Sequence, residues 1–158
     1  MFRIGIIGAG WITEKMAFAL SKTEDMQVYA IGSRSIEKAE EFARRWNIPQ
    51  AYGSYEELVA DGNLDLVYIA TPHSHHYPHA KLALEHGKPI LVEKAFTANA
   101  REAEELIDLA HRKNIFLTEA IWTRYMPLSH KIGEIMASGI IGEPRIMTAT
   151  LCYMAEHK

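Results

Sequence analysis

Short apolar runs alternate along the chain with stretches in which apolar residues recur at helical spacing. The apolar runs predict strands over residues 2–7, 27–32, 64–70, 89–92 and 115–118. The amphipathic stretches predict helices over residues 11–22, 36–46, 77–86, 100–113 and 127–138. The 64–70 run shows little polar alternation, which is typical of a strand covered on both faces. The pattern predicts the α/β class, with a doubly wound parallel sheet of the Rossmann type.

Helix-capping residues stand at several of these boundaries. Ser35 and Asn99 precede two of the helices, and Ser54 with Glu57 has the spacing of a capping box. Gly87 follows another helix, where a glycine favours the C-terminal cap. The caps support the helical assignments independently of the apolar pattern.

The stretch over residues 144–153 is β-prone, and no helical pattern follows it. A strand at this place indicates either the edge of the sheet or the first strand of a further domain. Its backbone needs a partner, so we expect it to pair with another copy of the chain or to be mobile.

Composition narrows the class of protein. The chain has 158 residues, 48% hydrophobic and 23% charged, with a net charge of −3, so it has no basic field for nucleic acid or anionic lipid. No apolar run approaches the roughly 20 residues of a membrane helix, and the N-terminus lacks a signal-peptide layout. The single cysteine, Cys152, cannot form an internal disulfide, which indicates a reducing compartment. We expect a cytoplasmic protein without nucleic-acid or membrane partners.

A glycine-rich loop follows the first predicted strand and opens the first helix. Gly8 permits a tight turn, and Gly10 lets the backbone approach a pyrophosphate. The phosphates then lie on the amides of the helix start, at Trp11 and Ile12. The third motif position holds Thr13, a bulkier residue than the usual Gly or Ala, so helix and strand can lie slightly farther apart. The alternative is a plain glycine turn without a nucleotide.

The end of the second predicted strand indicates which dinucleotide binds. An NAD site usually has an acidic residue there, but the first carboxylate in this chain is Glu37. Ser33 can donate to a 2′-phosphate, and Arg34 and Lys38 can pair with it. We predict NADP as the first choice, with NAD possible. The alternative is a solvated pair of cations at a helix start.

Three further stretches have recognisable motifs: Ala-Thr-Pro-His-Ser-His-His over residues 70–76, Val-Glu-Lys-Ala over 92–95, and Glu-Ala-Ile-Trp-Thr-Arg-Tyr-Met-Pro over 119–127. Together with the glycine loop, they resemble the Gfo/Idh/MocA oxidoreductase family. The third stretch is similar in particular to the trans-1,2-dihydrobenzene-1,2-diol dehydrogenase and xylose dehydrogenase branch. The resemblance covers essentially the whole chain.

The resemblance implies that Thr71, Pro72 and His73 form a loop over the ribose and nicotinamide side of the cofactor. It also implies that His76 begins the next helix against the cofactor. A loop at the carboxyl end of a central strand is where an open α/β sheet binds such ligands.

The same stretch raises the alternative of a metal site, because His73, His75, His76 and His79 are close in sequence. No Asp, Glu or Cys accompanies them, and the family has no metal here. We therefore predict no metal and a solvated histidine run beside the cofactor.

Glu93 and Lys94 match the first two residues of the family's Glu-Lys-Pro motif. The resemblance implies that Lys94 lies near the nicotinamide and is the catalytic residue, with both residues at the cofactor. Oxidation of an alcohol carbon requires removal of the hydroxyl proton, which a lysine can perform only if burial or positive charge lowers its pKa. Ala95 replaces the motif's proline, and a cis bond before alanine costs about 3 kcal/mol. Either a cis or a trans bond, and hence two placements of Lys94, stays open. A surface lysine at a strand end is the alternative.

Trp122 and Arg124 match the family segment that lines the nicotinamide end between two domains. An aromatic face and a fixed cation suit a hydroxylated or diol substrate. Burial of Trp122 in the core is the alternative.

Family members are roughly twice as long as this chain. The resemblance implies an NAD(P)-binding Rossmann domain over residues 1–143 and, over 144–158, the start of a C-terminal domain that is otherwise missing. That domain would carry substrate contacts and the interface of a homo-oligomer. We predict an NAD(P)-dependent oxidoreductase that acts on a sugar, polyol or trans-diol hydroxyl carbon, with little turnover by the fragment itself. The alternative is a stand-alone NAD(P)-sensing module without catalysis.

Overall fold

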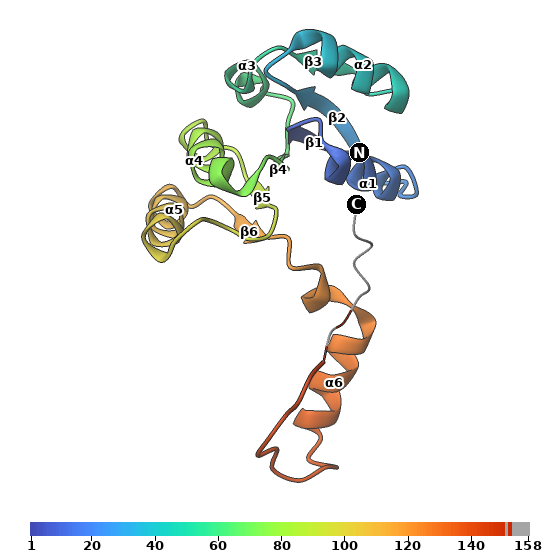
Figure 1. Ribbon diagram of the computed structural model, residues 1–158, viewed down its shortest axis with the longest axis vertical. Helices are drawn as coiled ribbons and strands as arrows, with labels where there is room; N and C mark the ends of the chain where they lie inside the picture. The colour runs from blue at the N-terminus through green and yellow to red at the C-terminus, as the bar shows by residue number, and fades with distance from the viewer. Residues whose placement is uncertain (151, 153–158) are drawn as a thin grey trace. The chain divides into compact units, whose positions relative to one another are not determined.

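The computed structural model describes residues 1–150 and 152. Within them one sheet has six parallel strands in the order β3-β2-β1-β4-β5-β6 (Figure 1). The strands are β1 (Phe2–Ile7), β2 (Met26–Gly32), β3 (Gln50–Tyr52), β4 (Leu66–Ile69), β5 (Ile90–Val92) and β6 (Leu117–Glu119). This is the strand order of a doubly wound Rossmann sheet, so the predicted fold class is confirmed.

The α-helices are α1 (Trp11–Leu20), α2 (Ile36–Trp46), α3 (Tyr55–Ala60), α4 (His76–Glu85), α5 (Ala100–Lys113) and α6 (Pro127–Ala137). Two short 3-10 helices are η1 (His73–His75) and η2 (Trp122–Tyr125). The chain divides into two compact units, Met1–Ala120 and Ile121–Lys158. The whole sheet belongs to the first unit, and η2 and α6 belong to the second.

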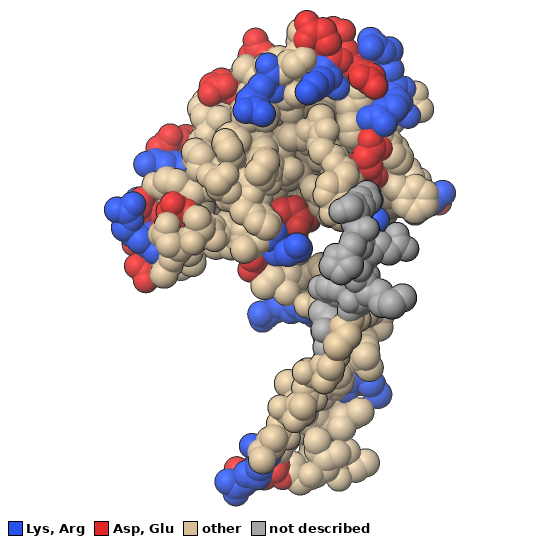
Figure 2. Space-filling model, in the orientation of Figure 1, with Lys and Arg blue, Asp and Glu red and all other residues tan. Residues whose placement is uncertain are grey.

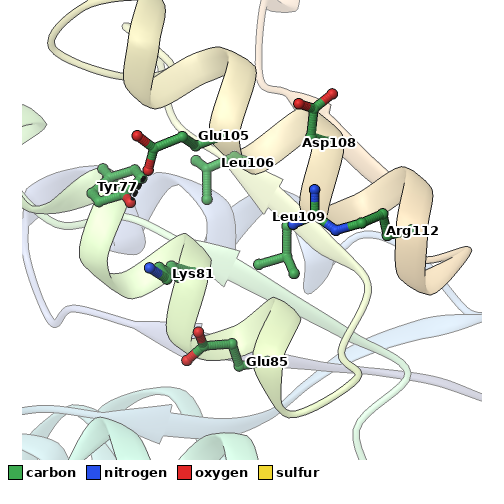
Figure 3. A pocket seen from close by; sticks show the side chains of 8 residues that line it. All are labelled: Tyr77, Lys81, Glu85, Glu105, Leu106, Asp108, Leu109 and Arg112. Atoms are coloured by element: carbon green, nitrogen blue, oxygen red, sulfur yellow. Dashed lines mark hydrogen bonds between the residues drawn. The ribbon is translucent and has the colours of Figure 1, made fainter.

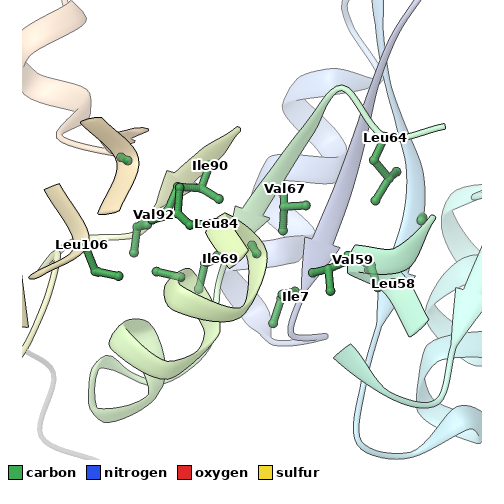
Figure 4. Packing of buried hydrophobic residues seen from close by; sticks show 14 residues of the cluster. Ile7, Leu58, Val59, Leu64, Val67, Ile69, Leu84, Ile90, Val92 and Leu106 are labelled. Carbon is green, nitrogen blue, oxygen red and sulfur yellow. The ribbon is translucent and has the colours of Figure 1, made fainter. Parts of the chain in front are cut away.

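Successive residues of each central strand face opposite sides of the sheet, as strand geometry requires. On one side, β-strand residues such as Ile7, Val67 and Ile69 pack against α3, α4 and α5 (Figure 4). On the other side, Ile6 and Tyr68 pack against α1 and α2. Two apolar layers therefore hold the helices in place on the two faces of the sheet.

Side-chain caps begin three helices where they were predicted. The side chains of Ser35, Ser54 and Asn99 accept hydrogen bonds from the amides three residues later, at 3.4, 3.2 and 3.0 Å. The reciprocal capping-box bond, from the Ser54 amide to the Glu57 carboxylate, is not among the side-chain bonds of the described residues. The backbone at Gly87 has a φ of 75°, consistent with its predicted place after the helix.

Apart from shifts of one or two residues at several element ends and the two 3-10 helices, the structure differs from the expected elements in two places. β3 has only three residues, too few for a periodic pattern to reveal it. Residues 144–150 form no strand, because a strand is defined by pairing and this segment has no paired neighbour among the described residues. The remainder of the predicted strand includes residues 151 and 153, which lie outside the described residues.

Candidate functional site

The predicted site residues of the first unit gather at one edge of the sheet. Parallel strands place their carboxyl ends together, so the loops after β1, β2, β4 and β5 are neighbours. These loops contain Gly8–Gly10, Ser33–Arg34, Thr71–His73 and Glu93–Lys94. The strand order reverses between β1 and β4, which is the point where open α/β sheets bind ligands.

The glycine loop is closely packed on the loop after β4. Gly8 has a φ of 104°, and a Cβ there would lie 3.0 Å from the Ala70 carbonyl oxygen. The buried Thr13 hydroxyl donates a 2.6 Å hydrogen bond to the Gly8 carbonyl oxygen. The third motif position therefore fastens α1 to the loop, a role that neither glycine nor alanine has.

The N-terminus of α1 has the form of an anion site. Its N-cap is Gly10, which offers no side-chain hydrogen bond, whereas side chains cap α2, α3 and α5. A Cβ at Gly10 would meet no atom within 4 Å, so the fold itself does not require a glycine here. The first amides of a helix lack intrahelical partners, and they attract phosphate together with the helix dipole. The residues present thus fit a dinucleotide pyrophosphate.

Charged side chains follow β2. Ser33 is buried, and its Oγ accepts a 3.3 Å bond from the Ser35 amide, while its hydroxyl also has a hydrogen to donate. Arg34 and Lys38 are exposed. The Ser35 hydroxyl donates to the Glu37 carboxylate at 2.6 Å, which lowers the pKa of Glu37. Two cations and one fixed carboxylate therefore surround this strand end.

His79 and Tyr55 lie beside the loop after β4. The His79 Nδ1 is 3.0 Å from the Thr71 hydroxyl, and the ring contacts Tyr55 edge-on at 4.6 Å between centroids. Burial, with the nearby His75 as a smaller cause, lowers the pKa of His79 to about 4. His79 is therefore neutral at neutral pH. Among the described residues, no group of three or more His, Cys, Asp or Glu side chains could hold a metal ion.

His76 begins α4, as predicted, but its ring is fully buried. Its two nitrogen atoms lie 2.7 Å from the Ala95 carbonyl oxygen and 2.8 Å from that of Thr71. A direct contact between this ring and a cofactor does not fit the burial. The ring instead lies between the loop after β4 and the turn after β5, in contact with both.

Lys94 lies in the turn after β5 and is exposed. The peptide bond between Lys94 and Ala95 is cis, which is one of the two geometries that the sequence left open. The Tyr68 hydroxyl donates to Glu93, and burial together with this bond raises the pKa of Tyr68. Glu119 accepts a bond from the Phe96 amide at 2.8 Å. Glu119 is part of the motif over residues 119–127, but the sequence did not identify it as a site residue.

Trp122 and Arg124 lie on η2 in the second unit, and both are exposed. Trp122 has 61% of its surface exposed, which does not favour the alternative of a core residue. Within this unit the Ser129 hydroxyl donates to the Thr123 carbonyl oxygen, joining η2 to the first turn of α6.

A groove of about 320 Å³ lies elsewhere, between α4 and α5 (Figure 3). It is lined by Tyr77, Lys81, Glu85, Glu105, Leu106, Asp108, Leu109 and Arg112. None of these residues was predicted at the site, and all of them belong to α4 and α5 rather than to the loops after the strands. Basic and acidic side chains are mixed on the face that Figure 2 shows, with no field of one sign. Within the part of the chain that is described, no helix combines the length and apolar character needed to cross a membrane.

Comparison with known proteins finds relatives over nearly the whole chain. The chain is 41% identical over 157 residues to mouse trans-1,2-dihydrobenzene-1,2-diol dehydrogenase, covering 98% of the chain and 47% of that protein. It is 47% identical over 150 residues to D-xylose 1-dehydrogenase (NADP(+)) of Hypocrea jecorina, covering 87% of the chain and 38% of that protein. The chain therefore spans less than half the length of these relatives.

Solved structures have the same fold. An NAD binding oxidoreductase from Klebsiella pneumoniae matches 90% of the chain with a TM-score of 0.86 and 30% identity, over 40% of its own chain. The 3-ketoreductase KijD10 from Actinomadura kijaniata, in complex with NADP, matches 90% of the chain with a TM-score of 0.80 and 29% identity, over 45% of its own chain. Residues 2–120 match the family described as "Oxidoreductase family, NAD-binding Rossmann fold". The chain belongs to this family, Gfo/Idh/MocA.

Proposed function

We propose that this chain is the NADP-binding domain of an oxidoreductase that acts on a hydroxyl carbon of a sugar, polyol or trans-diol. The observation that carries the proposal is the uncapped N-terminus of α1 behind Gly8 and Gly10, with Arg34 and Lys38 at the neighbouring strand end. The names of the relatives support the substrate class, since they are dehydrogenases of a diol and of xylose.

The sheet order supports a placement for each half of the dinucleotide. With the pyrophosphate over β1, the adenosine half lies over β2, where Ser33, Arg34 and Lys38 can meet a 2′-phosphate. The other half then lies over β4 and β5, near the Thr71–His73 loop and Lys94. When bound, the nicotinamide ring supplies the hydride chemistry. Lys94 would hold the substrate hydroxyl and accept its proton, so both groups would act on one alcohol carbon.

NAD is the second candidate, because Glu37 places a carboxylate in the same turn as the cations. A carboxylate accepts a hydrogen bond from a ribose 2′-hydroxyl but repels a 2′-phosphate. The bond from Ser35 engages this carboxylate within its own turn, which favours NADP.

Titration of the chain with NADPH and NADH, followed by nucleotide fluorescence, tests the choice. We expect NADPH to bind more tightly. Arg34→Ala should cost about 1.5–3 kcal/mol of NADPH affinity, the typical worth of a charged hydrogen bond, and leave NADH affinity almost unchanged. Arg44→Ala, on the last turn of α2, is the control and should affect neither ligand. Equal affinities of the wild type, or an NADH preference, would contradict the NADP assignment.

Turnover is proposed for the protein that contains this domain together with a C-terminal α/β domain. We propose that the Rossmann domain ends at residue 143. We also propose that the whole protein is a cytoplasmic homo-oligomer. A stand-alone NAD(P)-sensing module remains the alternative. Against it, a sensor needs only the pyrophosphate and adenine ends, whereas this chain also presents Lys94, Trp122 and Arg124.

A further inference from the structure

The main chain of the turn over residues 94–96 is held by acidic side chains. The Lys94 amide donates to the Glu93 carboxylate at 3.2 Å, and the Phe96 amide donates to Glu119 Oε1 at 2.8 Å. Glu119 is the last residue of β6, the neighbouring strand, and it is half-buried. Both bonds bind backbone rather than the Lys94 ammonium, so they position the turn and leave the lysine side chain exposed.

His76 contacts the same turn. Its Nδ1 faces the Ala95 carbonyl oxygen and its Nε2 faces the Thr71 carbonyl oxygen. Carbonyl oxygens only accept hydrogen bonds, so both ring nitrogens must donate for both bonds to form. Neutral imidazole has one N–H, and the imidazolium has two. Charge-assisted bonds to two carbonyls offset part of the cost of burying that charge.

We propose that His76 and Glu119 are positioning residues for Lys94, with His76 in the doubly protonated form. His76 joins the loop after β4 to the turn after β5, and Glu119 fixes the turn to β6. His76 and Glu119 thereby fix the positions of the two loops that face the nicotinamide half. This inference rests on the proposed function, because it concerns the geometry that the nicotinamide half meets.

Two ligands separate this role from general destabilisation. NADPH occupies both halves of the site, whereas adenosine 2′,5′-bisphosphate has the adenine and 2′-phosphate but no nicotinamide. For the 158-residue chain we expect Glu119→Ala and His76→Gln each to weaken NADPH about fivefold, the equivalent of one net hydrogen bond. The affinity for the bisphosphate should change less than about twofold, as expected of a site without a lost contact.

Glu119→Gln is the conservative variant, because its amide oxygen can still accept from the Phe96 amide. It should restore NADPH affinity close to that of the wild type. Glu134→Ala, on exposed α6, is the matched control and should leave both affinities unchanged. Equal weakening of both ligands, no weakening of NADPH, or failure of Glu119→Gln to restore binding would each overturn the role of Glu119.

The wild-type chain tests His76 without any substitution. Long-range ¹⁵N–¹H spectra of the imidazole ring should show protons on both Nδ1 and Nε2. A ring with one bare nitrogen would overturn the assignment that His76 joins the two loops. If the wild-type chain binds neither NADPH nor the bisphosphate, the proposed function itself fails, a result distinct from altered selectivity in the variants.

Discussion

The burial of His79 makes the stability of the first unit depend on pH. Its pKa lies at about 4 in the folded chain, below the usual value of 6.5, chiefly because of burial. Between these values the unfolded chain binds a proton that the folded chain does not, so stability falls as the pH is lowered from about 6.5 to about 4. Above this window His79 is neutral in both states and contributes no pH dependence.

Thermal unfolding of His79→Gln between pH 7 and pH 4.5 checks this effect. The wild type should lose about 1 kcal/mol more stability than the variant over this range, a value reduced for solvent screening of a half-buried ring. His130→Gln, on exposed α6, should follow the wild type. Identical pH dependence of His79→Gln and the wild type would show that His79 does not titrate in this window.

Single residues could be predicted where their role depends on local backbone geometry. Gly8 was such a case, since its φ of 104° is one that L side chains rarely adopt. Glu119 and Tyr55 were not identified, and His79 was expected only in a solvated histidine run, because their contacts join distant segments. The Glu119 bond to Phe96, for example, spans 23 residues. A local sequence pattern does not reveal such a contact.

At the scale of elements, the caps predict measurable stability. The Asn99 side chain accepts from the Glu102 amide at the start of α5, which has 14 residues. Asn99→Ala leaves that amide without its cap and should cost about 1 kcal/mol, or roughly 3 °C in Tm.

Circular dichroism melting curves give the measurement. Asn99→Asp keeps an acceptor at the N-cap and should melt within about 1 °C of the wild type, because Asn and Asp are nearly equal as caps. An unchanged Tm for Asn99→Ala would mean that α5 gains its stability from packing alone.

Elements that bury an apolar face were predicted from the sequence, because burial imposes a period on the residues. The bounds of α2 and α5 were predicted correctly from the caps and from the period of the apolar residues. β3 escaped prediction because three residues contain no period. The segment 144–150 shows the opposite case, in which β-prone residues form no strand among the described residues. Propensity does not replace pairing with a neighbour.

At the scale of the molecule, the candidate site exists because the sheet is parallel. Gly8 and Lys94 lie far apart in sequence, yet both follow strands whose carboxyl ends share one edge. The alternation of strands and helices was sufficient to predict that edge. The bonds that connect its loops, such as those of His76, depend on side-chain rotamers and could not be predicted.

Gly10→Ser tests the central claim, that the edge of the sheet binds a dinucleotide at the N-terminus of α1. A Cβ here meets no protein atom within 4 Å, and serine is at least as good an N-cap as glycine, so the fold should be intact. The side chain would instead occupy the space of the pyrophosphate. NADPH titration should show a loss of affinity of at least about tenfold, or 1.4 kcal/mol, with a Tm equal to or above that of the wild type. NADPH affinity equal to that of the wild type in a folded Gly10→Ser chain would contradict the claim.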